Sequence, residues 1–389
     1  MLKYHLARNL IVLAAAGLTL WPSAATAADA AWERAVAVPG VIDVAGPRSD
    51  GDLVVAGSAA LFLFDPASGK LEDFARGPGG YHDDAGKEAY LAISTGTHVQ
   101  SANCDFAPDE IFILRQHVPF GVSRVNAAGD ESGPFTNIPG VSSLTGITFD
   151  TGGAFDGRLL VTGKSAAGIT SLFGVDCNGG VMVIARSIPS VEGGMAIAPS
   201  GFGKFAGALV AADTVSGRVY AIAANGTVAS IGRPSVAGGP EVGVETAGFV
   251  PPRFFDAGGS LYYADARTGH LMRLTSDALK AAGVNEGYLL VAAERGAPVV
   301  TAHCDPTCVG AFVIRTPTAV RGEGHFAFVL NTPTEEEPAP TPVATRAQPA
   351  VPLGVVDFAG MWGIPTAVFV LLIAFLAVVA VQAIRRRAR

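Results

Sequence analysis

The sequence lacks the short motifs that mark the commonest catalytic and nucleotide-binding sites. It contains no G-x-S-x-G motif, no Walker A loop, no G-x-G-x-x-G after an expected strand, no HExxH and no EF-hand loop. A serine hydrolase of the α/β type, a P-loop nucleotide hydrolase and an HExxH metalloprotease are therefore not expected.

Charge is also scarce, because charged residues make up only 16% of the chain and the net charge is −7. Six basic residues near the two termini contribute +6, so the remainder carries −13: Lys3, Arg8, Arg385, Arg386, Arg387 and Arg389. An acidic domain repels phosphate backbones, so no nucleic acid is expected as a partner.

Long helical patterns are missing from the middle of the chain, which is rich in glycine, with 48 glycines in the whole sequence. The best helical candidate is short, from Ser276 to Ala282, with Ser276 as a possible N-cap and Gly283 as the stop. High glycine with low charge is typical of tight turns between half-buried strands. An all-β domain over residues 28–330 is therefore predicted.

The N-terminus carries the pattern of a secretory signal peptide over residues 1–27. Lys3 and Arg8 precede an apolar run from Leu10 to Leu20, and Ala25-Thr26-Ala27 offers a cleavage site before Ala28. A retained membrane helix is the alternative, but the apolar run is about half of the roughly 20 residues that a span requires.

The C-terminus instead predicts a transmembrane helix over residues 362–384. No charge occurs from Ile364 to Ile384, Trp362 suits the membrane interface, and an arginine-rich tail follows over residues 385–389. Positive charge marks the cytoplasmic side, so the N-terminal side is expected outside the cell. The alternatives are a buried core helix and a tail that is removed after sorting, although no LPxTG-like motif precedes it.

A stalk is expected between the domain and the membrane, over residues 331–361, because Thr332 to Pro352 is rich in Pro, Thr, Ala and Glu. The sequence thus predicts a single-pass protein of the cell membrane with an extracellular or periplasmic ectodomain.

Four cysteines lie in the predicted ectodomain, where export permits disulfides. Four cysteines allow three pairings. Cys304 and Cys308 are close enough to close a small loop, which would leave Cys104 for Cys177. The same Cys-x-x-x-Cys with His303 beside it could alternatively hold a metal.

Internal repetition is the most informative feature of the ectodomain. Gly207 to Ile231 is typical of a three-stranded meander, with Asn225-Gly226 as a two-residue hairpin turn. Similar units begin at five other positions, and a further strand precedes several of them. The other units begin at Gly51, Glu110, Gly157, Gly259 and Gly310, and the preceding strands are Tyr90–Ser94, Gly146–Phe149, Met195–Ala198 and Gly248–Val250.

Four strands in about 50 residues, repeated six times, predict a six-bladed β-propeller. A pair of β-sandwiches is the alternative. In a propeller, the N-terminal strand near Val41–Val44 is expected to pair beside the last blade and close the ring.

Two alignments are used to set the register of the repeats. Residues 101–105 match residues 301–305, and the match continues to Phe112 and Phe312. Val191-Glu192 matches Val244-Glu245 at an offset of 53 residues.

The segments EGGMAIAP with GKFAGALVAADTVSGRVYAI, and GFVPP with GGSLYYADARTGHLMRL, resemble blades of the NHL and SMP-30/gluconolactonase-like superfamily. That resemblance implies six blades and, in the hydrolase members, a divalent metal in the central tunnel, usually calcium. The metal is held there by a Glu of an E-G motif together with Asn and Asp residues, and Glu192-Gly193 resembles that motif.

Candidate site residues follow from these patterns. Glu192 and Glu245 are expected just ahead of innermost strands, where two carboxylates could bind a hard cation such as Ca²⁺. Asp213 and Asp265 each precede a glycine turn and are expected to accept backbone N–H groups. An acidic loop and a lone histidine complete the list: His82, Asp83, Asp84, Glu88 and His98.

Two functions remain open from the sequence. One is a binding module at the cell surface, with a protein, a glycan or a small molecule as ligand. The other is a metal-dependent hydrolase, similar to lactonases or esterases, with its site in the central channel.

Overall fold

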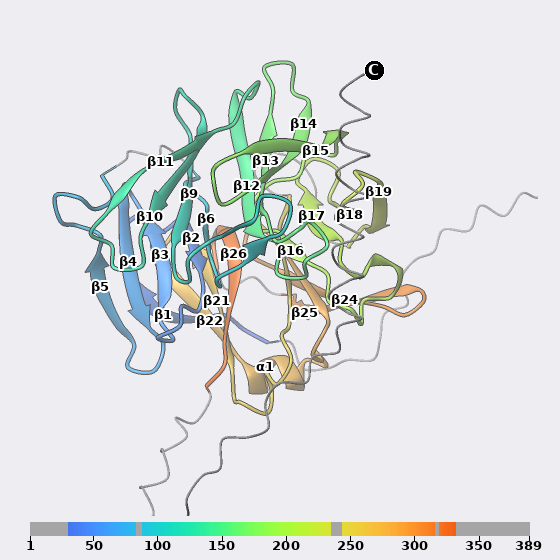
Figure 1. Cartoon of the computed structure of the whole chain (residues 1–389). Coiled ribbons are helices and arrows are strands. Elements are labelled where there is room, and N and C mark those ends of the chain that lie inside the picture. The colour runs from blue at the N-terminus through green and yellow to red at the C-terminus, as the bar shows by residue number, and fades with distance from the viewer. Residues whose placement is uncertain (1–29, 83–87, 235–242, 316–318, 332–389) are drawn as a thin grey trace, which may run out of the picture. The chain divides into compact units, whose positions relative to one another are not determined.

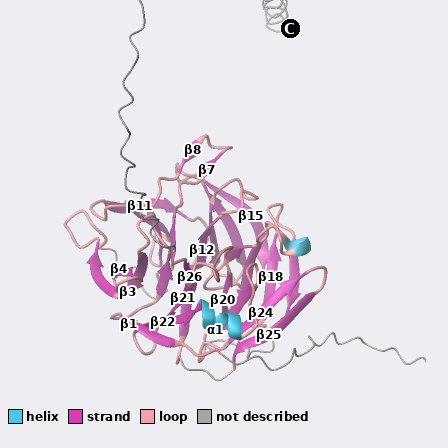
Figure 2. Cartoon of the chain, turned by 90° about the horizontal axis from the view of Figure 1, so that it is seen from below, coloured by secondary structure: helices cyan, strands magenta, loops and turns pink. Residues whose placement is uncertain are grey.

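The computed structural model describes residues 30–82, 88–234, 243–315 and 319–331 of the chain. Within these residues, six antiparallel four-stranded sheets and one two-stranded sheet are present. The sheets are arranged around a common centre (Figure 1), and helices are confined to short segments (Figure 2). The predicted all-β, six-bladed propeller is confirmed.

Blades 1 to 4 take their strands in chain order, from the innermost strand outward. The strands are β2 (Asp43–Ala45), β3 (Leu53–Gly57), β4 (Ala60–Asp65) and β5 (Lys70–Phe74) in blade 1; β6 (Leu91–Ile93), β9 (Ile111–Arg115), β10 (Gly121–Val125) and β11 (Ser132–Asn137) in blade 2; β12 (Ser143–Phe149), β13 (Leu159–Lys164), β14 (Thr170–Val175) and β15 (Val181–Ile188) in blade 3; and β16 (Ala196–Ile197), β17 (Leu209–Asp213), β18 (Arg218–Ile222) and β19 (Val228–Gly232) in blade 4. The meander units and preceding strands predicted for blades 2 to 4 are thus confirmed.

Blades 5 and 6 are interleaved, which the repeat pattern did not predict. From inside outward, blade 5 contains β20 (Val244–Phe249), β23 (Leu289–Ala293), β24 (Val299–Cys304) and β25 (Cys308–Ile314), and blade 6 contains β26 (Gly322–Val329), β21 (Ser260–Asp265), β22 (His270–Thr275) and β1 (Glu33–Ala37). The chain leaves blade 5 after its innermost strand, forms the two middle strands of blade 6, and returns through α1 (Ser276–Ala281) to complete blade 5.

Three expectations are wrong as a result. The strand at Gly248–Val250 belongs with β23 and not with the unit from Gly259, and the unit from Gly310 is the outermost strand of blade 5 instead of a new blade. The alignment of Phe112 with Phe312 also fails, because these residues lie in a second and a fourth strand. Hairpin sequences are local, whereas the sheet that a hairpin joins depends on packing far along the chain.

The ring is closed by residues other than those expected. β1 pairs with β22, with Glu33 opposite Arg273 and an ion pair of 2.8 Å between their side chains. Val41 and Ile42 instead lead into β2, the innermost strand of blade 1, which contains Asp43 and Val44. Blade 6 therefore combines three separate chain segments, which ties both ends of the propeller sequence into one sheet.

A small hairpin, β7 (His98–Val99) with β8 (Cys104–Asp105), interrupts the connection between β6 and β9 and stands out from the ring in Figure 2. The Cys104–Cys177 disulfide joins it to the turn between β14 and β15. A second disulfide joins Cys304 to Cys308 across the β24–β25 hairpin. Both favoured pairings are confirmed, so these cysteines do not act as metal ligands.

Two local expectations need correction by one residue. α1 is capped by Thr275, whose hydroxyl accepts the N–H of Ala278, and not by Ser276. The hairpin at Asn225-Gly226 has a three-residue loop, because Ala223 and Thr227 still pair and only Gly226 has a positive φ, of 82°.

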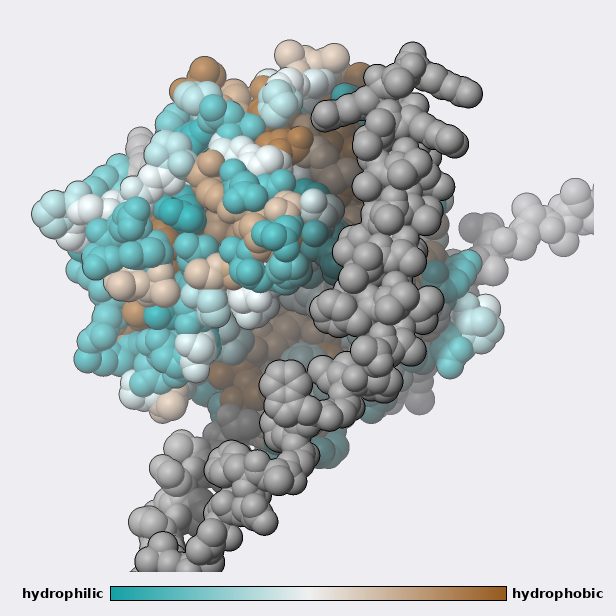
Figure 3. Space-filling view, in the orientation of Figure 1, coloured by the Kyte–Doolittle hydropathy of each residue, from teal (hydrophilic) through white to brown (hydrophobic). Residues whose placement is uncertain are grey.

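The core consists of apolar clusters between neighbouring blades. Between blades 2 and 3, Phe106 packs edge-on against Phe112 and Phe149, with ring centroids 5.3 and 5.0 Å apart. The outer surface over blades 1 and 2 is mainly hydrophilic, with hydrophobic residues scattered among polar ones (Figure 3). Each blade alone would expose its apolar faces to water, so their burial against the next blade is the main stabilising contribution.

No helix among the described residues is long and apolar enough to cross a membrane. The predicted signal peptide, all of the predicted stalk after Asn331, the predicted transmembrane helix and the predicted tail lie outside the described residues.

Candidate metal centre at the propeller axis

Three buried glutamates meet at one end of the propeller axis. Glu245 and Glu323 are the second residues of the innermost strands β20 and β26, and Glu294 directly follows β23. Because β23 is antiparallel to β20, its last residue lies beside the start of β20. One oxygen from each carboxylate lies within 4.8 Å of the others. We call Glu245, Glu294 and Glu323 the acidic end.

Two further side chains bind these carboxylates. Arg321 places Nη2 2.6 Å from Oε1 of Glu294 and Nε 3.2 Å from Oε2 of Glu323. The Tyr90 hydroxyl donates to Oε1 of Glu323 at 2.6 Å and lies 3.5 Å from Oε1 of Glu245. One guanidinium and one phenol therefore compensate part of the buried negative charge.

Glu245 is the carboxylate left least satisfied. Its Oε2 atom is buried without a hydrogen-bond partner among the described residues. Burial, followed by the charges of Glu323 and Glu294, raises the pKa of Glu245 well above its usual value. Burial also raises the pKa of Glu323 to about 7, although the Tyr90 hydrogen bond and Arg321 oppose that shift. The acidic end would thus take up protons or a cation near neutral pH.

A buried ion pair closes the axis below the acidic end. Asp43 of β2 lies 2.9 Å from Nδ1 of His325 in β26, and Nε2 of the same imidazole lies 2.7 Å from the carbonyl oxygen of Ile147. Both ring nitrogens face acceptors, so the geometry favours the doubly protonated ring. Burial alone would lower the pKa of His325, but the Asp43 carboxylate outweighs it and the pKa is raised. Asp43 also accepts the N–H of Leu91, so this layer joins four blades.

The opposite end of the axis holds an apolar cavity of about 410 Å³. It is lined by later residues of the same innermost strands, and His325 lies at its boundary with the ion-pair layer. Its apolar lining includes Ile93, Phe149, Met195, Phe249, Phe326 and Phe328.

The structure brings only one of the two predicted metal ligands into the carboxylate group. Glu245 belongs to it, whereas Glu192 lies just ahead of β16 with its carboxylate 3.6 Å from Nζ of Lys164. Glu192 is still near enough to help raise the pKa of Glu245. The alignment at an offset of 53 residues predicted equivalent positions for Glu192 and Glu245. This is confirmed, because both glutamates lie at the starts of innermost strands.

Sequence reasoning missed four members of the site: Tyr90, Glu294, Arg321 and Glu323. Glu323 carried a usable signal, because Glu323-Gly324 repeats the pattern of Glu192-Gly193, and both glycines have a positive φ, of 72° and 75°. A Cβ on Gly324 would lie 2.1 Å from Oδ1 of Asp43, so only glycine allows this close approach. Glu294 had no such signal, because its proximity depends on the interleaved strand order.

The remaining candidates have structural roles in the described residues. Asp213 accepts the N–H groups of Val215 and Ser216, as predicted for a turn. Asp265 likewise fixes its own turn and also accepts the N–H groups of Val320 and Arg321, which positions Arg321.

The predicted acidic loop and lone histidine are placed only in part. His82 lies 2.7 Å from the carbonyl oxygen of Gly77, while Asp83 and Asp84 lie outside the described residues and Glu88 lies within them. His98 pairs with Asp105 at 2.8 Å.

No protein-family model and no curated protein matches the sequence. Solved structures with a similar fold include virginiamycin B lyase from Staphylococcus aureus, with 10% identity over 72% of this chain and 73% of that one and a TM-score of 0.40. Another is the calcium-binding protein regucalcin from Agrobacterium tumefaciens, with 11% identity over 76% of this chain and 80% of that one and a TM-score of 0.42. A third is a gluconolactonase from Xanthomonas campestris, with 13% identity over 59% of this chain and 70% of that one and a TM-score of 0.37. The class defined by the fold and the site is a six-bladed β-propeller with a carboxylate cluster on its axis.

Proposed function

We propose that the chain is a metal-dependent hydrolase of lactones or related esters, whose divalent cation is held by the acidic end. The observation that carries this proposal is the buried Oε2 atom of Glu245, which has no hydrogen-bond partner among the described residues and belongs to the group of three carboxylates. A buried carboxylate oxygen without a donor is strongly destabilising unless a proton or a cation satisfies it.

Charge and distance both favour a divalent ion. Three ionised carboxylates and the Arg321 guanidinium leave a net charge of −2, which one divalent cation would neutralise. Calcium binds carboxylate oxygens at about 2.3–2.6 Å, so ligand atoms on opposite sides of the ion are about 5 Å apart. Oxygens within 4.8 Å of one another fit that span.

The surrounding side chains have defined tasks in this proposal. Arg321 orients Glu294 and Glu323, and Asp265 holds Arg321 in place. Tyr90 keeps its proton, because burial and the charges of Glu245 and Glu323 raise its pKa well above 10, and it thereby fixes Glu323 as an acceptor. A bound cation would polarise a substrate carbonyl and activate water. The resemblance of the segments around residues 191–231 and 244–274 to gluconolactonase-like blades supports a lactone or ester as substrate, with the acidic end in place of Glu192 as the holder of the cation.

The proposed setting is the cell envelope. The signal peptide and the C-terminal helix expected from the sequence would place the propeller outside the cytoplasm, anchored by one span. The two disulfides are compatible with an oxidising compartment.

Calcium titration by calorimetry tests the metal site, with Glu245→Gln as the variant and Glu192→Gln as the matched control. We expect one site in the wild type, affinity reduced by at least about tenfold in Glu245→Gln, and a change below about threefold in Glu192→Gln. The reason is that Glu245, unlike Glu192, has a buried carboxylate oxygen without a hydrogen-bond partner among the described residues. Lactone hydrolysis with and without EDTA then tests the activity. A wild-type protein that binds no divalent cation would contradict the proposal.

A surface binding module is the second candidate, favoured by four exposed aliphatic side chains on the loops at the acidic end. Val118, Ile169, Val215 and Val320 are between 48% and 80% exposed. The first three lie in connections from the second to the third strand of a blade, and Val320 lies two residues before the start of β26. These loops share one face of the ring, so they would offer scattered apolar contacts to a protein or glycan.

Binding of the purified protein to isolated envelope fractions tests this candidate. A variant with Val118→Ser, Ile169→Ser and Val215→Ser should bind less if these loops form the contact, and calcium affinity should not change. Equal binding by the variant and the wild type would exclude this face.

A further inference from the structure

A second cavity adjoins the apolar cavity on the face opposite the acidic end. It measures about 550 Å³ and has a polar lining that includes Thr97, His98, Gln100 and Asp156. Thr95 and Thr151 line both cavities, so the two form one continuous cleft. The β6–β9 connection, which carries the β7–β8 hairpin, forms one wall of the polar part.

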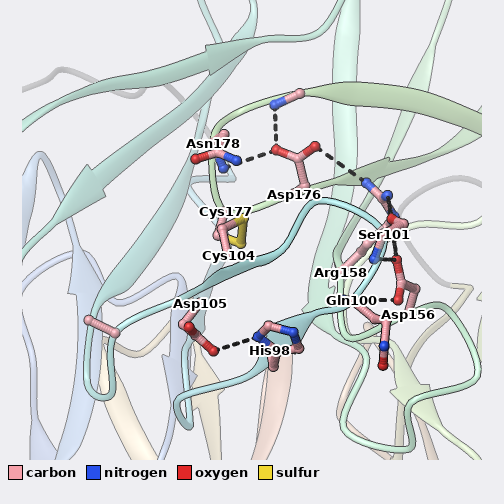
Figure 4. Close-up of a disulfide and its surroundings, with 12 residues drawn as sticks. His98, Gln100, Ser101, Cys104, Asp105, Asp156, Arg158, Asp176, Cys177 and Asn178 are labelled. Carbon is pink, nitrogen blue, oxygen red and sulfur yellow. Dashed lines mark hydrogen bonds and ion pairs between the residues drawn. A yellow bond between two sulfur atoms is a disulfide. The ribbon is translucent and has the colours of Figure 1, made fainter. Parts of the chain in front are cut away.

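This wall is fixed by covalent and apolar contacts. The Cys104–Cys177 disulfide joins the hairpin of blade 2 to a turn of blade 3, and Phe106 is buried between the two blades. Asp156 accepts the backbone N–H groups of Gln100 and Ser101, as Figure 4 shows in part. Each tether crosses from blade 2 to blade 3, so the polar cavity has preformed walls, which lowers the entropy loss on ligand binding.

The carboxylates around the polar cavity are engaged in hydrogen bonds and ion pairs within the protein. Asp105 pairs with His98, and Arg158 lies 3.6 Å from Asp156 and 3.7 Å from Asp176 (Figure 4). Asp150 accepts three backbone N–H groups, from Gly152, Phe155 and Gly157. An anionic ligand would meet an excess of negative charge among these residues, and a cation would have to displace the donors that the carboxylates already bind. Hydroxyl groups, by contrast, could exchange hydrogen bonds with amide, imidazole and hydroxyl groups.

We propose that this cleft is a binding site for an uncharged amphipathic small molecule. An apolar or aromatic body would occupy the axial cavity, beside Phe249, Phe326 and Phe328, and a hydroxyl-bearing head would occupy the polar cavity, beside His98 and Gln100. The volume, the apolar lining and the few polar groups match those of small-molecule sites. The site does not depend on the cation at the other end of the axis.

Fluorescence titration with 4-methylumbelliferyl β-D-glucoside tests the proposal, since this probe joins an aromatic body to a neutral hydroxylated head. Methyl β-D-glucoside and 4-methylumbelliferone serve as half-probes, used as competitors. We expect the full probe to bind at least about tenfold more tightly than either half-probe. The reason is that the linked probe loses translational and rotational entropy only once while it makes the contacts of both halves.

Two variants address the apolar cavity and its junction. Ala196→Trp would fill the apolar cavity, and Thr95→Trp, at an exposed position, would block the junction even if the first variant folds poorly. Each variant should reduce the affinity for the full probe by at least about tenfold, which is the usual size of the effect when an apolar contact in a filled pocket is lost. Ala229→Trp, at an exposed position of β19, is the matched control and should bind like the wild type.

A variant with His98→Ala and Gln100→Ala addresses the head group and should weaken the full probe toward the affinity of 4-methylumbelliferone. Wild-type affinity in Thr95→Trp, or a full probe that binds no more tightly than 4-methylumbelliferone, would overturn the proposal. Glu245→Gln should leave probe binding unchanged, so failure here and failure of the metal site are distinguishable.

Discussion

The two ends of the propeller axis use the same innermost strands but have opposite chemistry. At the start of β20 and β26 lie Glu245 and Glu323, and four to five residues later the same strands present Phe249 and Phe328 to an apolar cavity. The layer of Asp43 and His325 separates the two environments. One short strand can therefore supply a charged site and an apolar site, provided that a buried ion pair divides them.

The two ends are held in place by different parts of the fold. The acidic end depends on the first residues of β20 and β26, on the residue after β23, and on the loop before β26, which Asp265 fixes through the N–H groups of Val320 and Arg321. The cleft at the other end depends on aromatic side chains in its apolar part and, in its polar part, on an insertion that is held by a disulfide. Mutations at one end should therefore leave binding at the other end intact.

Loss of the dividing layer should have the largest effect. Asp43→Ala leaves the His325 imidazolium and the Leu91 N–H without their acceptor, so we expect the free energy of unfolding to fall by about 3–5 kcal/mol. Asp73→Ala is the matched control, because the side-chain contact of Asp73 within the described part of the chain is an exposed ion pair with Arg76. It should lower that free energy by less than about 1 kcal/mol. Urea denaturation measures both, and similar values would mean that the layer is not a structural divider.

Removal of the disulfides should give the next largest loss of stability, and it should weaken ligand binding at one end of the axis but not at the other. Cys104 and Cys177 are 73 residues apart, so the double serine variant should lose about 4 kcal/mol in the chain-entropy description. Cys304 and Cys308 are 4 residues apart, and their double serine variant should lose about 2 kcal/mol.

Chemical denaturation gives both values, and ligand titrations give the selectivity. Only the Cys104–Cys177 variant should bind the glucoside probe less tightly, while calcium affinity should stay unchanged in both variants. Weaker calcium binding after loss of Cys104–Cys177 would show that the ends are coupled.

Much of the fold was predictable because strand, turn and period are local signals. The four strands of blades 2, 3 and 4 follow each other in sequence, and turn residues such as Asp213 act as expected. The interleaving of blades 5 and 6 was not predictable, because β21 and β22 have the pattern of an ordinary meander and nothing in that pattern names the sheet they join. Their partner β26 lies more than 45 residues further along the chain.

Only those residues of the candidate site that follow the repeat of strands along the chain were predictable from the sequence. Glu245 was identified because it repeats Glu192 at the start of an innermost strand. Glu294 and Arg321 join the site through the returning path of the chain and through Asp265, which are tertiary effects. The pairing of Asp43 with His325 spans 282 residues and has no sequence signature.

Calcium affinity should depend on pH at the acidic end, with a smaller effect than the losses above. Protons compete with the cation, since burial raises the pKa of Glu245 well above its usual value and that of Glu323 to about 7. Affinity should therefore fall by more than about tenfold between pH 8 and pH 6. Calorimetry in both buffers measures the change, with Glu192→Gln as control, which should show the same dependence. A flat profile would place the cation away from these carboxylates.

Replacing the Glu245 carboxylate by an uncharged amide should give the smallest effect on stability. Unlike the changes above, it should stabilise the metal-free protein. A carboxyl group with a raised folded-state pKa contributes stability below about pH 4.5, and this is lost as pH rises through the folded-state value. A glutamine side chain carries no charge and can donate its amide N–H to neighbouring carboxylates, so Glu245→Gln should avoid that loss. With EDTA at pH 8 we expect the melting temperature to rise by about 2 °C, or roughly 1 kcal/mol.

Melting temperatures measured at pH 5 test this explanation for Glu245→Gln. There the wild-type carboxyl group is protonated, so the gain should disappear. Glu192→Gln removes only a partly exposed contact with Lys164 and should not raise the melting temperature at either pH. A stabilised Glu245→Gln protein that no longer binds calcium would mean that the wild type keeps a destabilising carboxylate for its ligand. A destabilised one would mean that Glu245 serves the fold, and the acidic end would then be a structural network that needs no cation.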